Sequence, residues 1–265
     1  MIAVVIPVHD VLPVRRTPWV TYALIAINVV VFLLTPASRT TGVQATQASQ
    51  LCSQEAFYDR YAAVPKELVH GQTPAKVPTG QAVNTPQGPA CVVAPPAYHK
   101  VPVLSVLYSM FLHGGWLHLL GNMLFLWVFG NNVEDRLGRI RYLLFYLVCG
   151  YAAAYAFALV NPDSSEPLIG ASGAIAGVLG AYLVLYPRAR VWSLVPFLLF
   201  IPLRLPAWLV LGLWFLLQWA YSAGFAVSQA GDVAYLAHVA GFVLGALLAL
   251  PLRARPGPRR VIRPY

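Results

Sequence analysis

Charged residues are scarce in this sequence of 265 residues, in which Asp, Glu, Lys and Arg together make up only 10%. An ordinary soluble domain is about 25% charged. Apolar residues make up 58% of the chain, and its mean hydropathy is +0.65. This composition leaves too little polar surface to cover a compact body in water, so we expect lipid to solvate much of it. The same composition excludes a disordered chain.

Cysteine is also rare, with residues only at positions 52, 91 and 149. Three cysteines are too few for a disulfide-built scaffold, and they lack the close paired spacing of a zinc site. We therefore predict no metal site. Cys149 lies inside an apolar run and is expected to be a buried core residue.

Long apolar runs are abundant, and six of them reach or approach the roughly 20 residues that a helix needs to cross a bilayer. They are Trp19–Leu34, Gly114–Gly130, Tyr142–Val160, Ala171–Tyr186, Ala207–Val227 and Val233–Leu252. In lipid every backbone N–H and C=O must be paired, and these runs are too long and too uniformly apolar for alternating strands. The predicted fold class is therefore all-α, a polytopic membrane protein with a bundle of six transmembrane helices.

A seventh apolar run, Val191–Leu203, is short for a span and contains Pro196 and Pro202, which disturb a helix. Basic residues precede and follow this run, so crossing the membrane would place positive charge on both faces. We interpret it as an interfacial connection. Six spans then return both termini to the same side.

Basic residues are distributed unequally between the two sides that six spans define. One side carries thirteen of the 18 Lys and Arg residues: Arg15, Arg16, Arg136, Arg139, Arg141, Arg188, Arg190, Arg204, Arg253, Arg255, Arg259, Arg260 and Arg263. The other side carries Arg39, Arg60, Lys66, Lys76 and Lys100. The positive-inside rule therefore predicts that the first side, with both termini, is cytoplasmic. Because most basic residues lie at the ends of apolar runs, membrane topology explains them better than nucleic-acid binding.

This topology divides the chain into a cytoplasmic segment 1–17, a membrane region 18–252 and a basic cytoplasmic tail 253–265. The first connection, residues 36–100, is the only sizeable piece outside the membrane and is predicted to face outward. Cys52 and Cys91 both lie in it. An oxidising compartment would let them pair, and two free thiols are the alternative.

Asp, Glu, Lys and Arg are absent from the predicted spans, which disfavours an ion-coupled transporter. Polar side chains inside a span are costly, so they mark candidate functional groups. Apart from Thr21, Ser222 and the tyrosines, the spans contain Asn28, His118, Asn122, Ser172, Gln218 and His238, and His113 comes just before the second span. This set includes the groups that acyl transfer requires.

Ser172 is the candidate nucleophile, because it lies in Gly170-Ala171-Ser172-Gly173 at the start of a predicted helix. Free N–H groups and the positive end of the helix dipole there favour a developing negative charge. A serine flanked by glycines could instead serve helix packing alone.

His238 is the candidate general base, because it is the only imidazole in the last four spans. Small residues recur at helical spacing in two of these spans, as Gly173, Gly177 and Gly180 and as Gly241 and Gly245. Two such faces permit close backbone approach, which would bring Ser172 to His238. The alternative is a histidine that only hydrogen-bonds between helices. Asp232 is expected at the outer end of the last span, so we predict a Ser-His dyad.

His118 and Asn122 lie four residues apart on one helix face and are the candidate oxyanion donors. The backbone N–H of Ser172 could supply another donor. Alternatively, the pair could tie the second span to its neighbours.

Three short segments, in this order along the chain, resemble the rhomboid intramembrane serine proteases. They are His113–Asn122, with two histidines and an asparagine, Gly170–Gly173 around the serine, and Ala237–Gly241, continuing to Gly245, around the last histidine. The resemblance covers the six-span region. It implies Ser172 as nucleophile, His238 as base, and His118, Asn122 and the Ser172 N–H as oxyanion donors, around a water-filled cavity that opens outward.

This resemblance also implies partners and location. Its members cut membrane-anchored substrates in or near the transmembrane segment, and neither a metal nor an organic cofactor is expected. We expect an integral protein of a bacterial inner membrane, with transmembrane proteins and lipid as partners and no nucleic acid. The alternatives are a catalytically inactive rhomboid-like protein that binds client helices, and a channel or transporter.

The sequence departs from the family pattern at two places. The fourth residue after the serine, an aromatic that stacks on the histidine in some members, is Ala176 here, so the imidazole must be held otherwise. The first connection lacks the Trp-Arg pair of some bacterial members and is longer than expected. The fifth span, rich in Trp and Phe, lacks a small-residue face. We expect it either to move as a lateral gate or to be an ordinary lipid-facing helix.

Overall fold

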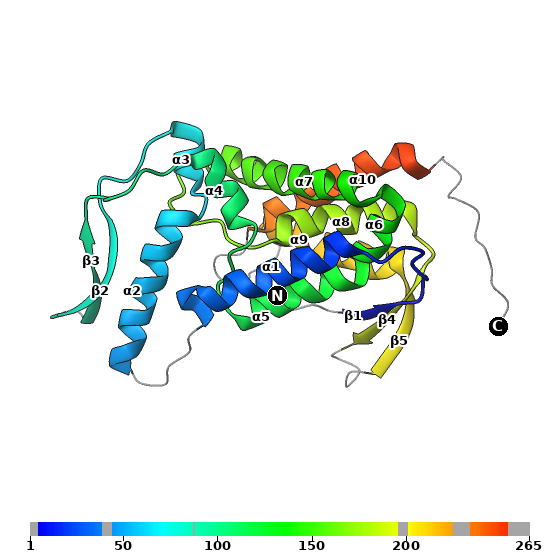
Figure 1. Cartoon of the computed structure of the whole chain (residues 1–265), viewed down its shortest axis with the longest axis horizontal. Coiled ribbons are helices and arrows are strands. Elements are labelled where there is room, and N and C mark those ends of the chain that lie inside the picture. Colours follow the sequence, from blue (N-terminus) through cyan, green and yellow to red (C-terminus); the bar gives the residue numbers. More distant parts are fainter. Residues whose placement is uncertain (1–4, 39–43, 87, 196–200, 225–233, 254–265) are drawn as a thin grey trace.

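The computed structural model describes residues 5–38, 44–86, 88–195, 201–224 and 234–253. This part of the chain is mostly helical, with small sheets at opposite ends of the helix bundle (Figure 1). The helices are α1 (Trp19–Leu34), α2 (Gln44–Tyr61), α3 (Pro65–His70), α4 (Pro102–Ser109), α5 (Trp116–Phe125), α6 (Asn131–Leu137), α7 (Arg139–Val160), α8 (Ser172–Leu185), α9 (Ala207–Ser222) and α10 (Tyr235–Arg253). Short turns of other helix types are η1 (Pro36–Ser38) and η2 (Leu126–Gly130). The strands are β1 (Ile6–Asp10), β2 (Val77–Thr85), β3 (Gly88–Ala94), β4 (Arg190–Val195) and β5 (Ile201–Pro206).

Each of the six predicted spans is helical where the structure describes it, so the helical character of the fold is confirmed. The second span begins as α5, passes through the π-helical turn η2 and continues into α6. Among the described residues, α7 and α10 are long and apolar enough to cross a membrane, and α1, α8 and α9 are apolar but shorter. The count of six spans stays a prediction, and residues 225–227 of the fifth predicted span and the predicted tail 254–265 lie outside the described residues.

The all-α prediction is incomplete, because the described parts of the run Val191–Leu203, which was interpreted as an interfacial connection, are β-strands. Its described parts belong to β4 and β5, which pair antiparallel, and β1 pairs antiparallel with β4. β4 alternates buried and partly exposed side chains, as a strand with one packed face does. Pro202, which argued against a helix, lies on the edge strand β5, where a missing N–H is tolerated. The antiparallel pair β4–β5 therefore lies between α8 and α9 in the chain.

The first connection forms a second unit at the other end of the bundle, which we call the outer insert (residues 36–100) after the side on which the sequence predicts it. It contains α2, α3 and the antiparallel pair β2–β3 (Figure 1). A disulfide joins Cys52 of α2 to Cys91 of β3, so the two cysteines are paired. Closing a loop of this size is worth about 4 kcal/mol in the chain-entropy description. Cys149, as predicted, is a buried free cysteine.

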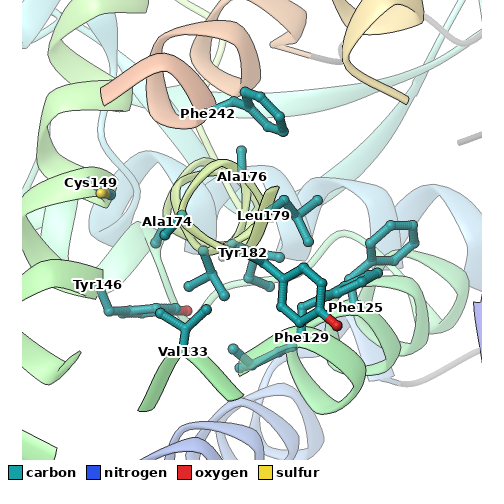
Figure 2. Packing of buried hydrophobic residues seen from close by; sticks show 14 of the residues in the cluster. Phe125, Phe129, Val133, Tyr146, Cys149, Ala174, Ala176, Leu179, Tyr182 and Phe242 are labelled. Carbon is teal, nitrogen blue, oxygen red and sulfur yellow. The ribbon is translucent and has the colours of Figure 1, made fainter. Parts of the chain in front are cut away.

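The core of the bundle lies around α8. Figure 2 shows side chains of α8, among them Leu179 and Tyr182, surrounded by Tyr146 of α7, Phe129 of η2 and Phe242 of α10. Tyr146, Leu179, Tyr182 and Phe129 are completely buried. Such contact on all sides fixes the position of α8, and therefore of Ser172 at its first residue.

Glycines let α8 and α10 approach until their backbones touch. A Cβ atom added to Gly180 would collide with the carbonyl oxygen of Phe242, and one added to Gly241 would collide with that of Gly173. A Cβ atom on Gly245 would likewise meet the backbone of Gly177. The close approach predicted from the glycine spacing is therefore observed.

Sequence reasoning missed a buried carboxylate just beyond the second predicted span. Glu134 of α6 is 3% exposed and accepts hydrogen bonds from the backbone N–H groups of Val20 and Thr21 and from the Thr21 hydroxyl. Those N–H groups belong to the first turn of α1, where no helical partner exists for them. A carboxylate at that position also complements the helix dipole. Glu134 therefore anchors the start of α1.

A buried ion pair holds the outer insert together. The Lys100 ammonium lies 2.6 Å from a carboxylate oxygen of Glu67, and both side chains are 3% exposed. The same ammonium donates a hydrogen bond to the backbone oxygen of Asp59 in α2. Burial raises the pKa of Glu67, and the neighbouring Lys100 opposes that rise.

The Lys100→Met variant is expected to lose about 3 to 5 kcal/mol of unfolding free energy at neutral pH, because Glu67 stays buried without its partner. Without Lys100 the pKa of Glu67 rises further above its unfolded value. The folded state then binds the proton more tightly, so the deficit shrinks as the pH falls through that raised pKa. Unfolding in detergent between about pH 4 and 8 measures this. The exposed Lys66→Met is the control, and a deficit independent of pH would contradict the prediction.

Candidate active site

A cavity of about 1040 Å³ is lined mainly by residues of the bundle helices and the loop before α8. Ser172, His118 and His238 line it from three different helices. Tyr58 of the outer insert and Glu166, in the loop before α8, also contribute to its wall. Since polar groups converge in a mostly apolar concavity, it is the candidate active site.

Ser172 and His238 lie in direct contact within this cavity. The Ser172 Oγ is 2.7 Å from Nε2 of His238. Ser172 begins α8 immediately after a turn at Gly170, whose φ of 120° strongly favours glycine. His238 lies one turn before Gly241, where α10 touches the backbone of α8. The glycine contacts therefore place the His238 imidazole beside the Ser172 hydroxyl.

The other imidazole nitrogen of His238 is held by α9. Its Nδ1 is 2.7 Å from Oε1 of Gln218, and both side chains are buried. The Trp214 ring, also from α9, lies beside the imidazole with centroids 6.0 Å apart and planes inclined by 35°. Because the aromatic of some family members is replaced by Ala176 on α8, the His238 imidazole is instead held by Gln218 and Trp214 of α9.

His118 and Asn122 lie beside the turn that precedes Ser172. A Cβ atom built on Gly170 would be 2.7 Å from Nε2 of His118 and 3.6 Å from Nδ2 of Asn122. Nδ1 of His118 faces the backbone N–H of Gly114 at 3.5 Å. Asn122 is 2% exposed and does not line the cavity directly. Both predicted donors are therefore adjacent to the turn that precedes α8.

His113, to which sequence reasoning gave no role, holds Asn122. Nδ2 of Asn122 is 3.0 Å from Nε2 of His113, whose side chain is completely buried. Burial, with His118 nearby, lowers the pKa of His113 to about 3, so its ring is neutral and can accept a hydrogen bond from the amide. Tyr58 fixes His113 in turn by donating its hydroxyl to the His113 backbone oxygen.

The segment before Ser172 is tied to α4 and to the outer insert. The backbone N–H of Gly170 donates to the Ser109 carbonyl at 2.9 Å, and that of Leu168 donates to the Ala63 carbonyl at 2.7 Å. The backbone N–H of Ala63 then donates to the Ser109 hydroxyl. Three segments distant in sequence thus hold the turn that presents the serine.

The family to which this architecture corresponds follows from comparison with known proteins. The family model of the rhomboid domain matches residues 102–255, which contain Ser172, His238, His118 and Asn122. The chain belongs to the rhomboid family. Rhomboid proteins are polytopic helical proteins integral to the membrane, in agreement with the helical bundle described above.

Curated relatives carry the same family name. The chain is 33% identical over 150 residues to "Rhomboid protein 1, mitochondrial" of Saccharomyces cerevisiae, covering 54% of this chain and 40% of that protein. It is 34% identical over 155 residues to "Rhomboid protease GluP" of Bacillus subtilis, covering 58% of this chain and 28% of that one. It is 32% identical over 158 residues to "RHOMBOID-like protein 4" of Arabidopsis thaliana, covering 57% and 34%. The chain thus matches less than half the length of each of these rhomboid relatives.

The structure brings together the four site residues that the rhomboid resemblance singled out, and adds others. Asp232, expected at the outer end of the last span, lies outside the described residues. Sequence reasoning noted Gln218 only as a polar residue in a span. Its signal was an amide isolated in the apolar α9, since such a group needs a partner in lipid. Among the described residues no group of three or more His, Cys, Asp or Glu is arranged to hold a metal ion.

Proposed function

We propose that this rhomboid family member is an intramembrane serine endopeptidase, with Ser172 as nucleophile and His238 as general base. The observation that carries the proposal is the 2.7 Å contact between the Ser172 Oγ and His238 Nε2 inside the cavity. A serine hydroxyl is a weak nucleophile until a neighbouring base accepts its proton, and the contact provides that base.

The reaction proceeds in two steps. Nε2 of His238 accepts the Ser172 proton as Oγ forms a bond to the scissile carbonyl carbon, which gives a tetrahedral oxyanion. The C–N bond then breaks, and the protonated imidazole gives its proton to the leaving amine, leaving an acyl group on Ser172. A water molecule, activated by the same imidazole, hydrolyses the acyl group and restores the serine. The cavity provides space for this water at the serine.

His118, Asn122 and the Ser172 backbone N–H are proposed to stabilise the oxyanion. The proximity of Nε2 of His118 and Nδ2 of Asn122 to Gly170 supports this assignment. Nδ1 of His118 faces a backbone N–H, so the ring proton belongs on Nε2, as a donor requires. The first N–H groups of α8 have no helical partner and add a positive potential at the same point.

The proposed substrates are transmembrane segments of membrane-anchored proteins. A helix buries its peptide bonds in its own hydrogen bonding, so the scissile segment must unwind, and helix-breaking residues should favour cleavage. We also propose that substrates enter the cavity from the lipid, beside α9. Trp208 and Trp219 of α9 are about half exposed, which suits contact with lipid.

The proposed topology places the cavity mouth and the outer insert on the outer side of a bacterial inner membrane, with both termini cytoplasmic. The Cys52–Cys91 disulfide supports this orientation, because disulfides persist in oxidising compartments. Tyr58 of the insert lines the cavity, so the two face the same side. Segments 1–17 and 253–265 then form the cytoplasmic ends of the membrane region 18–252.

Labelling with a fluorophosphonate probe tests the proposed function. The probe reacts with an activated serine, so we expect covalent modification of the folded protein in detergent, mapped to Ser172 by peptide mass spectrometry. Heat-denatured protein is the control and should not be labelled. Absence of labelling in the folded protein, or labelling at another serine, would favour an inactive rhomboid-like protein that binds client helices.

A further inference from the structure

We propose that Gln218 of α9 is a positioning residue that fixes the tautomer and orientation of the His238 imidazole. This inference rests on the proposed function, because it concerns the state of the base that activates Ser172. The juxtaposition behind it is a chain of three side chains from three helices, in which Gln218 Oε1, the two nitrogens of His238 and Ser172 Oγ lie in series.

Gln218 is placed where an amide needs a partner. Its side chain is 5% exposed and comes from a helix whose other residues are almost all apolar. A buried polar group that lacks a hydrogen bond destabilises the folded protein. The contact of 2.7 Å with His238 Nδ1 satisfies the carbonyl oxygen of this amide.

The chemistry of the amide oxygen determines which imidazole nitrogen carries the proton. A carbonyl oxygen only accepts hydrogen bonds, so Nδ1 facing it must be the protonated nitrogen. In a neutral imidazole Nε2 then has a free lone pair, and Nε2 is the atom that faces the Ser172 hydroxyl. The opposite tautomer would present an N–H to the serine and could not accept its proton.

An amide suits this position better than the carboxylate of a conventional triad. The polar groups near the ring are the Ser172 hydroxyl of α8, His118 of α5, which lines the same cavity, and Tyr235 of α10 itself, while Glu166 lies on the cavity wall. None of the described groups in contact with His238 is a carboxylate. A neutral amide orients the ring without the cost of burying an unpaired negative charge.

Three variants test this role: Gln218→Met, which removes the acceptor at similar size, Gln218→Glu, which keeps an oxygen facing Nδ1, and Leu216→Met as the control. Leu216 lies two residues away on the exposed face of α9. The readouts are kcat and KM on a transmembrane reporter and the nitrogen-15 NMR signals of isotopically labelled histidine.

We expect Gln218→Met to lower kcat by about 10- to 100-fold, the range for loss of an orienting hydrogen bond, and to leave KM within about twofold. Its nitrogen-15 signals should show mixed tautomers of His238, whereas wild type shows Nδ1 protonated. Gln218→Glu should recover at least about tenfold of the lost kcat above neutral pH, where its carboxylate accepts a hydrogen bond, and Leu216→Met should match wild type.

A Gln218→Met variant with wild-type kcat, a loss in KM alone, or a Gln218→Glu variant no better than Met would overturn the role of Gln218. The NMR signature separates this inference from the proposed function. If wild type ignores the fluorophosphonate probe, the proposed function fails, while the histidine signals still report whether Gln218 sets the tautomer. If Gln218→Met does not fold, Gln218→Glu alone decides. A His238 tautomer and a kcat equal to those of wild type support the role of Gln218 as acceptor. A reversed tautomer with a wild-type kcat contradicts it.

Discussion

The Ser172→Ala variant is expected to leave a transmembrane reporter uncut, with a rate at least about 10,000-fold below wild type. Alanine has no atom that could attack the carbonyl carbon, and the 2.7 Å contact with His238 Nε2 disappears. The His238→Ala variant should lose a similar factor, because an unassisted hydroxyl stays protonated at neutral pH. Cleavage in reconstituted liposomes, followed by the appearance of both fragments, measures the loss.

The double variant Ser172→Ala/His238→Ala provides a sharper criterion than either single change. If two residues act as one catalytic unit, removing either abolishes the contribution of both. The double variant should therefore be no slower than the single variants. The exposed His99→Ala is the matched control for loss of an imidazole and should cleave normally. Independent losses that multiply in the double variant would mean that the two side chains do not act as a dyad.

The Gly245→Ala variant is expected to lose at least about 3 kcal/mol of unfolding free energy, although it adds only one methyl group. The added Cβ atom would lie 2.5 Å from the carbonyl carbon and 2.6 Å from the Cα atom of Gly177. These are backbone atoms of a buried helix, so relief requires α8 and α10 to separate. Separation would lengthen the Ser172–His238 contact, and activity should fall together with stability. Thermal unfolding in detergent and the cleavage rate measure the two effects.

Gly212→Ala is the matched control, because Gly212 is also helical but has no atom within 4 Å of an added Cβ. There alanine should be neutral or stabilising by up to about 1 kcal/mol, since it reduces the flexibility of the unfolded chain. Equal melting temperatures for Gly245→Ala and wild type would show that the two helices are not held by backbone contact.

The helices of the bundle could be predicted because an apolar run in lipid has little choice of backbone conformation. The bounds of α1, for example, are those of its apolar run. The outer insert could not be predicted in this way, because α2 is polar on average and carries no strong periodicity. The strands β4 and β5 were not predicted. Pro202 argues against a helix but does not indicate a strand, and the other partner of β4 is β1, which is distant in sequence. Glu134 was predicted to lie outside the spans. Its burial follows from its hydrogen bonds to the start of α1, which the sequence does not show.

Within the candidate site, chemistry could nominate single residues but not their partners. Ser172 and His238 were proposed because acyl transfer needs an alcohol and a base, and the glycine spacing indicated how they could meet. Gln218 could be noted only as an amide in an apolar run, since its distance to Nδ1 depends on how α9 lies against α10. The same holds for His113, whose bond to Asn122 depends on the turn between α4 and α5.

The outer insert and the turn before Ser172 share backbone hydrogen bonds through Ala63 and Leu168. A shortened chain made by excising residues 36–100 would therefore leave the backbone N–H of Leu168, four residues before Ser172, without its hydrogen-bond acceptor. A fusion of this membrane region to another domain should therefore keep residues 58–67, and its junction should lie between Ala94 and Lys100, so that the Lys100–Glu67 ion pair is preserved.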